Sequence, residues 1–111
     1  MDIQIKRGLL EVCVLKAIQN SDSYGYKIIK DIAPYTSISE STLYPILRRL
    51  EASEMLKVYS EEHNGRLRKY YHITEKGQKR IYGFREEWKE ISLICNFICK
   101  GEEDGQNSVF K

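Results

Sequence analysis

The sequence lacks the features that mark secreted proteins, membrane proteins and enzymes. It has only three cysteines, an odd number inside apolar helical patterns, which argues against a disulfide-stapled secreted domain and favours a reducing cytosol. Glu11 and Lys16 interrupt the apolar segment near the start, so we expect neither a signal peptide nor a membrane span. No phosphate-binding glycine loop, nucleophile motif or metal-ligand spacing occurs. We therefore expect no enzyme activity, no metal and no cofactor.

An excess of charge of one sign is also nearly absent. The 111 residues include 18 basic and 16 acidic side chains, for a net charge of +2. This balance does not by itself indicate a protein that binds nucleic acid. Residues 75–111 carry seven charges of each sign, so the small positive excess lies in the first 74 residues. The length predicts one small domain, for which burial of a helix against a second copy would enlarge the core.

Residues 43–50 carry the pattern of an amphipathic helix with one polar face. Apolar side chains recur at the i, i+3, i+4 and i+7 positions, namely Leu43, Ile46, Leu47 and Leu50. At about 100° per residue, small hydroxyls, an aromatic ring and two arginines lie opposite or beside this stripe. We expect Ser39 or Ser41 to cap the helix and Pro45 to loosen its first turns. Such a polar face is typical of a helix that contacts DNA.

The segments around this helix complete a recognisable order of elements. Lys6–Asn20 is expected to be a first helix with a broad apolar face, and a second, supporting helix should run from about Gly25 to Pro34. Residues 56–59 and 69–73 alternate like strands on either side of an Asn64-Gly65 turn, and residues 63–71 carry three cations and no carboxylate. Three helices followed by a basic hairpin predict a winged helix-turn-helix, a mainly α fold with a small two-stranded β-wing.

A long last helix is expected from the Thr74 cap to about Lys100, and its apolar side chains follow heptad spacing. A second apolar strip at Ile94 and Phe97 is more than a lone helix needs to bury, so we expect a homodimer. The predicted interface residues are Leu9, Ile81, Phe84, Trp88, Ile91, Cys95 and Ile98. The predicted organisation is a DNA-binding domain over residues 1–74, a dimerisation helix over 75–100 in the same compact unit, and a disordered tail over 101–111.

Three linked motifs resemble the PadR family of bacterial transcriptional regulators. They are Tyr24–Ile28, Leu43–Glu51 and Gly65–Gly77, and the resemblance covers about residues 8–100. It implies a cytoplasmic dimeric repressor, of the branch with a single C-terminal dimerisation helix, that releases a two-fold double-stranded operator on an effector or stress signal. In multidrug-responsive members a tryptophan matching Trp88 lines a chamber for flat aromatic compounds, which implies Trp88 and Phe84 as ligand-binding residues here. Family members usually have glycine at the position of Glu54. How the helix that contains residues 43–50 ends in this chain is therefore left undecided by the sequence.

The expected DNA-binding residues are Ser39, Ser41, Thr42, Tyr44, Arg48, Arg49, Gly65, Arg66, Arg68 and Lys69. Each group also has a structural interpretation. The helix arginines fit a solvated surface, and charges on the hairpin fit the protection of a sheet edge. Trp88 fits a dimer core, and Cys95 and Cys99 fit apolar packing better than a redox switch or a metal pair. The alternative function is a winged-helix module that binds an acidic protein surface and has no operator.

Overall fold

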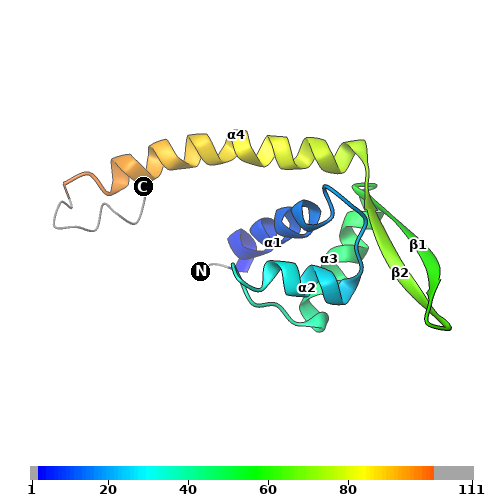
Figure 1. The fold of residues 1–111 in the computed structure, drawn as a ribbon. Coiled ribbons are helices and arrows are strands. Elements are labelled where there is room, and N and C mark those ends of the chain that lie inside the picture. Colours follow the sequence, from blue (N-terminus) through cyan, green and yellow to red (C-terminus); the bar gives the residue numbers. More distant parts are fainter. Residues whose placement is uncertain (1–2, 102–111) are drawn as a thin grey trace. The chain divides into compact units, whose positions relative to one another are not determined.

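The computed structural model describes residues 3–101, which form four helices and one β-hairpin (Figure 1). In chain order the elements are α1 (Ile3–Ala17), α2 (Gly25–Ile32), α3 (Glu40–Ala52), β1 (Leu56–His63), β2 (Arg66–Ile73) and α4 (Glu75–Ile98). This order confirms the predicted mainly α fold with a two-stranded wing. Of the tail that was expected to be disordered, residues 102–111 lie outside the described part of the chain.

The chain divides into two compact units, Met1–Ile81 and Tyr82–Lys111, and the division falls within α4. We call them the N-terminal unit and the C-terminal unit. The first turns of α4 belong to the N-terminal unit because they pack closely on it. A Cβ at Gly77 would collide with the main-chain oxygen of Met55 and with the side chain of Ile73, and Ile81 is buried. The expected functional division at residue 74 is thus seven residues before the structural one.

The core of the N-terminal unit forms where α1, α2 and α3 meet. Each of these helices contacts the other two, and α3 also contacts β1. All four side chains of the predicted stripe on α3 are at most 3% exposed. Burial of each such leucine or isoleucine contributes about 1.5–3 kcal/mol relative to exposure in water. The apolar stripe therefore fixes α3 on the other helices and leaves its opposite face toward solvent.

The first helix and both strands have bounds that differ from the expected ones. The first helix spans Ile3–Ala17 rather than Lys6–Asn20, because the N–H groups of Ile18 and Gln19 bond to carbonyls three residues back, and the chain then turns so that Ser23 pairs with β2. The strands are longer than the alternating patterns, because Asn64 (φ 51°) and Gly65 (φ 79°) form a two-residue turn that lets His63 pair directly with Arg66. Figure 1 shows the hairpin projecting from the three helices.

The end of α3 resolves the question raised by Glu54. Glu54 adopts a left-handed conformation with φ 62°, a region that glycine adopts without steric cost. The Met55 N–H donates to the Leu50 carbonyl at 2.9 Å, and the Glu54 N–H donates to the Glu51 carbonyl at 2.9 Å. These two bonds form a Schellman motif. The helix therefore ends as it would with glycine, at a conformational cost of about 1 kcal/mol for a side chain in this region.

We predict that Glu54→Gly raises the free energy of unfolding by about 1 kcal/mol, because glycine adopts the left-handed region without this steric cost. Urea unfolding measures the effect as an increase in the midpoint concentration. Glu51→Gly is the matched control, since it removes the same kind of side chain near the same helix end but at a helical position. It should lower stability by about 1 kcal/mol. A lower midpoint for Glu54→Gly would contradict this account of the helix end.

Candidate DNA interface

The N-terminus of α3 carries a cluster of hydroxyl groups. Ser39 is the N-cap, and its Oγ accepts a hydrogen bond from the Thr42 N–H at 3.3 Å, as one of the two predicted caps should. The same Oγ lies 2.9 Å from Ser41 Oγ and 3.2 Å from Thr42 Oγ1. All three residues are exposed. Hydroxyls at a helix N-terminus, where the helix dipole is positive, are suited to contact a phosphate or a base edge.

The two arginines of α3 differ in their surroundings. Arg49 Nε donates to Glu11 Oε2 on α1 at 3.1 Å, and the Arg49 side chain is 41% exposed. Arg48 is exposed and makes no hydrogen bond or ion pair within residues 3–101. Sequence patterns left open which arginine contacts bases. The ion pair orients Arg49 toward α1, whereas the Arg48 guanidinium has no such partner among the described residues.

Tyr44 packs against the beginning of α2. A Cβ at Gly25 would lie 2.7 Å from the Tyr44 hydroxyl oxygen, so a side chain at this position would require the Tyr44 ring to shift. The Tyr44 side chain remains 38% exposed. Tyr44 also affects the ionisation of Tyr71: burial is the main cause that raises the pKa of Tyr71, and electrostatic interactions with Tyr44 and Glu51 raise it further. Tyr44 thus connects α3 to α2 and still presents part of its ring to solvent.

The wing presents fewer net positive charges than residues 63–71 suggested. Arg66 and Lys69 are exposed, and the Arg68 guanidinium carbon lies 3.9 Å from the centroid of the Tyr24 ring. The opposite strand β1 adds two exposed carboxylates: Glu61 lies across from Arg68, and Glu62 lies across from Leu67. Gly65 occupies the turn with φ 79°. Arg66, next to this turn, is therefore the wing arginine that stands away from the helices.

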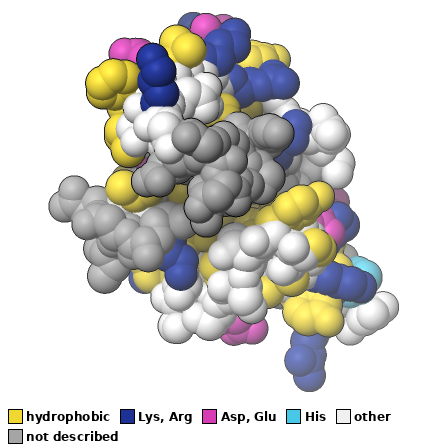
Figure 2. Space-filling model, turned by 90° about the vertical axis from the view of Figure 1, so that its left-hand side faces the viewer, with side chains coloured by type: hydrophobic (Ala, Val, Ile, Leu, Met, Phe, Trp, Pro, Cys, Tyr) yellow, Lys and Arg dark blue, Asp and Glu magenta, His cyan; other side chains and the backbone are white. Residues whose placement is uncertain are grey.

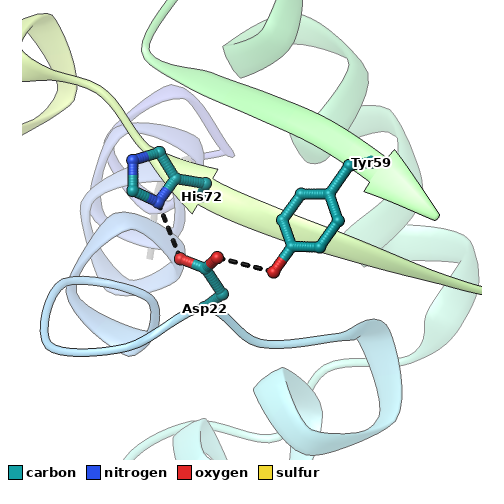
Figure 3. Close-up of polar contacts among 3 residues, drawn as sticks. All are labelled: Asp22, Tyr59 and His72. Atoms are coloured by element: carbon teal, nitrogen blue, oxygen red, sulfur yellow. Dashed lines mark hydrogen bonds and ion pairs between the residues drawn. The ribbon is translucent and has the colours of Figure 1, made fainter. Parts of the chain in front are cut away.

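A polar cluster joins the wing to the loop between α1 and α2 (Figure 3). The Tyr59 hydroxyl donates to Asp22 Oδ2 at 2.6 Å, and His72 Nδ1 lies 2.7 Å from Asp22 Oδ1. Hydrogen bonds from Tyr59 and then His72 lower the pKa of Asp22, whereas the bond to Asp22 raises the pKa of Tyr59 to about 12. Asp22 is therefore ionised and Tyr59 protonated across neutral pH.

Aromatic contacts and a β-bridge lie beside this polar cluster. Ser23 and Tyr71 exchange both backbone hydrogen bonds, at 3.2 and 2.8 Å, so the residue before α2 pairs with β2. Tyr70 stacks on Tyr59 with ring centroids 5.6 Å apart and meets Tyr24 edge-on at 5.8 Å. Sequence patterns assigned no role to Asp22 or Tyr59, and Tyr24 entered only as the first residue of a family motif. The turn-forming residues Asn20–Ser23 are the one local signal at this place, and they indicate no partner.

The C-terminal unit exposes a large apolar surface along α4. Phe84 and Trp88 stack with ring centroids 6.5 Å apart, and Trp88 is 53% exposed. The other exposed apolar side chains of this unit are Tyr82, Ile91, Leu93, Ile94, Phe97 and Ile98. Ile81, which heptad spacing also places in the predicted dimer interface, is 5% exposed within a single chain and belongs to the N-terminal unit, and its contact with a second copy stays a prediction. Cys95 is partly exposed on the same helix.

Figure 2 shows lysine and arginine side chains, in dark blue, at several separate places on the face that it presents. Within residues 3–101, no helix has the length and hydropathy to cross a membrane, and no three His, Cys, Asp or Glu side chains converge on a metal position. The candidate DNA-contacting side chains lie on α3 and the wing.

Comparisons with known proteins agree with this arrangement. The model of the "Transcriptional regulator PadR-like family" matches residues 14–82. A protein of Streptococcus mutans UA159 with a solved structure is 42% identical, with a TM-score of 0.75 over 86% of this chain and 90% of that one. A transcriptional regulator from Clostridium thermocellum is 34% identical, with a TM-score of 0.79 over 87% and 99%. An uncharacterized protein of Lysinibacillus sphaericus is 36% identical over 89% of this chain and 95% of its own length.

The family model covers more than half of the chain, from α1 through the wing to the first residues of α4. The solved relatives share the same fold over most of their length. The chain therefore belongs to the PadR-like family of transcriptional regulators.

Proposed function

We propose that this regulator is a homodimeric repressor that binds a two-fold operator in double-stranded DNA and releases it when a small aromatic effector binds. In this proposal residues 1–74 contact DNA, residues 75–100 pair the two copies, and the protein acts in the cytoplasm, where bacterial DNA lies. The observation that carries it is Arg48, whose side chain has no hydrogen-bond or ion-pair partner among residues 3–101 and lies on the exposed face of α3, beside the hydroxyl cluster and near a wing fixed to the same unit.

The side chains of Arg48 and Arg66 have no hydrogen-bond or ion-pair partner in the described part of the chain, and they take different roles in this proposal. Arg48 lies in the middle of α3, the helix that enters the major groove in winged helix-turn-helix proteins, where arginine donates to guanine O6 and N7. Arg66 lies next to the wing turn, where a cation reaches the phosphate backbone or the minor groove. Ser39, Ser41, Thr42, Tyr44, Gly65, Arg68 and Lys69 complete the proposed DNA-binding set, and Arg49 supports α3 through Glu11.

The exposed side chains of α4 support the homodimer. Phe97 is 77% and Ile98 68% exposed, and such apolar surface on a helix is typically covered by a partner. A second copy is the partner that heptad spacing indicates. The proposed interface comprises Leu9, Phe84, Trp88, Ile91, Cys95 and Ile98. Pairing of these helices would hold two α3 helices at a separation that suits neighbouring turns of DNA, about 34 Å.

The stacked Phe84 and Trp88 rings support an aromatic effector. Their interplanar angle is 20°, so they offer nearly parallel faces to a flat molecule. A compound bound there would act through α4, by favouring a spacing of the two α3 helices that does not match one turn of DNA.

We predict different effects for the two arginines on an operator selected from random DNA. Arg48→Ala should weaken binding to the preferred sequence by about 1–3 kcal/mol and relax the preference at one base pair. Arg66→Ala should weaken binding to all sequences similarly and reduce the slope of log affinity against log salt by about 1. Titrations at several salt concentrations measure both effects.

The exposed Lys16 on α1 supplies the control for these titrations, because Lys16→Ala removes one positive charge away from α3 and the wing. Equal affinities for wild type, Arg48→Ala and Arg66→Ala would reject the proposed interface. Weak binding without sequence preference, together with a protein partner that co-purifies, would favour the alternative function as a protein-interaction module.

We predict that the purified protein has twice the 13.1 kDa mass of one chain and that Ile91→Asp dissociates it at micromolar concentration. A carboxylate buried in the helix seam is unfavourable unless it is paired. Light scattering coupled to size-exclusion chromatography measures the mass. Asn96→Asp is the matched control, because it places the same carboxylate on an exposed position of α4 away from the heptad positions. A monomeric wild type would contradict the dimer.

We predict that a flat aromatic compound quenches the fluorescence of Trp88, the only tryptophan, and releases the operator over the same concentration range. The quenching follows from stacking on the exposed indole, and the release follows from the coupling through α4. Phe84→Ala should weaken both effects together. The absence of quenching across a broad panel of such compounds would reject the effector site.

A further inference from the structure

The loop between α1 and α2 makes more contacts with the wing than a connecting turn requires. Three successive residues of this loop, Asp22, Ser23 and Tyr24, each contact the hairpin in a different way. Asp22 accepts hydrogen bonds from Tyr59 of β1 and from His72 of β2. Ser23 forms a β-bridge with Tyr71, and Tyr24 contacts both Tyr70 and Arg68. Ser23 alone pairs with β2 through its backbone, and its two neighbours contact the hairpin through their side chains.

Without these contacts the hairpin would be held mainly at its base. Side chains on the core face of the hairpin are buried only near the base, at Leu56, Tyr71 and Ile73, whereas residues 59–67 are all exposed. A two-stranded hairpin in water has little stability of its own. The orientation of the wing therefore depends on contacts of its other face, and that face carries Tyr59, Tyr70 and His72.

We propose that Asp22 is a positioning residue for DNA binding: its two hydrogen bonds hold both strands of the wing against the loop before α2 and so orient Arg66 relative to α3. The inference rests on the proposed DNA-binding function. Asp22 reaches both strands at once, with Oδ2 toward β1 and Oδ1 toward β2 (Figure 3). Asp22 needs no contact with DNA for this role.

The charge of Asp22 makes the proposal testable by the sign of an effect. Removal of a carboxylate near a DNA-binding surface strengthens binding by electrostatics alone, since the repulsion of phosphates decreases. If Asp22 positions the wing, its removal instead weakens binding, because the wing then samples orientations in which Arg66 does not reach the backbone. The two accounts therefore predict opposite changes in affinity.

We predict that Asp22→Ala binds a selected operator about three- to tenfold more weakly than wild type, a loss comparable to the net contribution of one ordinary hydrogen bond. Tyr59→Phe, which changes no charge at neutral pH, should weaken binding in the same direction and by less. Asp31→Ala is the matched control, because Asp31 is an exposed aspartate of α2 that pairs with Lys27. It should leave affinity unchanged or raise it.

Two measurements without DNA separate the positioning role from the proposed function. The amide hydrogens of Ser23 and Tyr71 should exchange several-fold faster in Asp22→Ala than in wild type, because their mutual bonds open more often. The Tyr59 phenol, with a pKa raised to about 12 by Asp22, should ionise at lower pH in Asp22→Ala, as followed by phenolate absorbance and assigned with Tyr59→Phe.

Each outcome decides one claim. Unchanged hydrogen exchange and phenol ionisation in Asp22→Ala would overturn the claim that Asp22 holds the wing against the loop before α2. Faster exchange with unchanged or tighter operator binding would overturn the positioning role while leaving the DNA-binding proposal intact. Failure of the wild type to bind any selected DNA would overturn the proposed function, and with it the role of Asp22 in DNA binding.

Discussion

The pairing of Ser23 with Tyr71 is the contact on which the geometry of the N-terminal unit depends. Its two backbone hydrogen bonds join a loop residue near α1 to a strand that follows α3 by more than ten residues. Ser23 is 1% exposed, so these bonds are shielded from competing water. Because α2 begins at Gly25, the bridge also fixes where the second helix starts. The three helices and the wing thus become one body through a segment with no regular structure of its own.

A second set of contacts fixes the chain at the C-terminal end of α3. Thr74 Oγ1 donates to the Glu54 carbonyl at 2.7 Å and accepts from the Gly77 N–H at 3.1 Å, while the Thr74 N–H donates to the Met55 carbonyl at 3.1 Å. One threonine therefore caps α4 and satisfies the chain just after α3. These bonds explain how Glu54 is held in a left-handed conformation that an isolated helix end would avoid, since surrounding contacts fix the backbone there. The start of α4 follows from the end of α3.

The sequence predicted the features that depend on local periodicity and missed those that depend on pairing across the chain. The stripe of α3, the Ser39 and Thr74 caps and the Asn64-Gly65 turn are local, and the structure contains each of them. Family membership also agrees with the prediction that the chain is not an enzyme. The Arg49 ion pair with Glu11 and the contacts of Asp22 join residues 37 to 50 positions apart, and no local pattern encodes such partners. The extent of the hairpin was missed because its outer residues, apart from the exposed Leu67, are polar on both faces.

The distribution of charge explains how a chain with a net charge of +2 suits a DNA regulator. Several cations near the proposed interface are already engaged: Arg49 by Glu11, Lys27 by Asp31, and Arg68 by the Tyr24 ring. Glu61 and Glu62 further reduce the positive potential of the wing. A single copy then offers few cations to phosphates, and each contributes modestly to the release of counterions. Two linked copies would double that number at a fixed spacing, so the second site binds at high effective concentration. Weak attraction per copy would keep binding to unrelated DNA low, and under the proposed function the homodimer becomes the source of affinity as well as of symmetry.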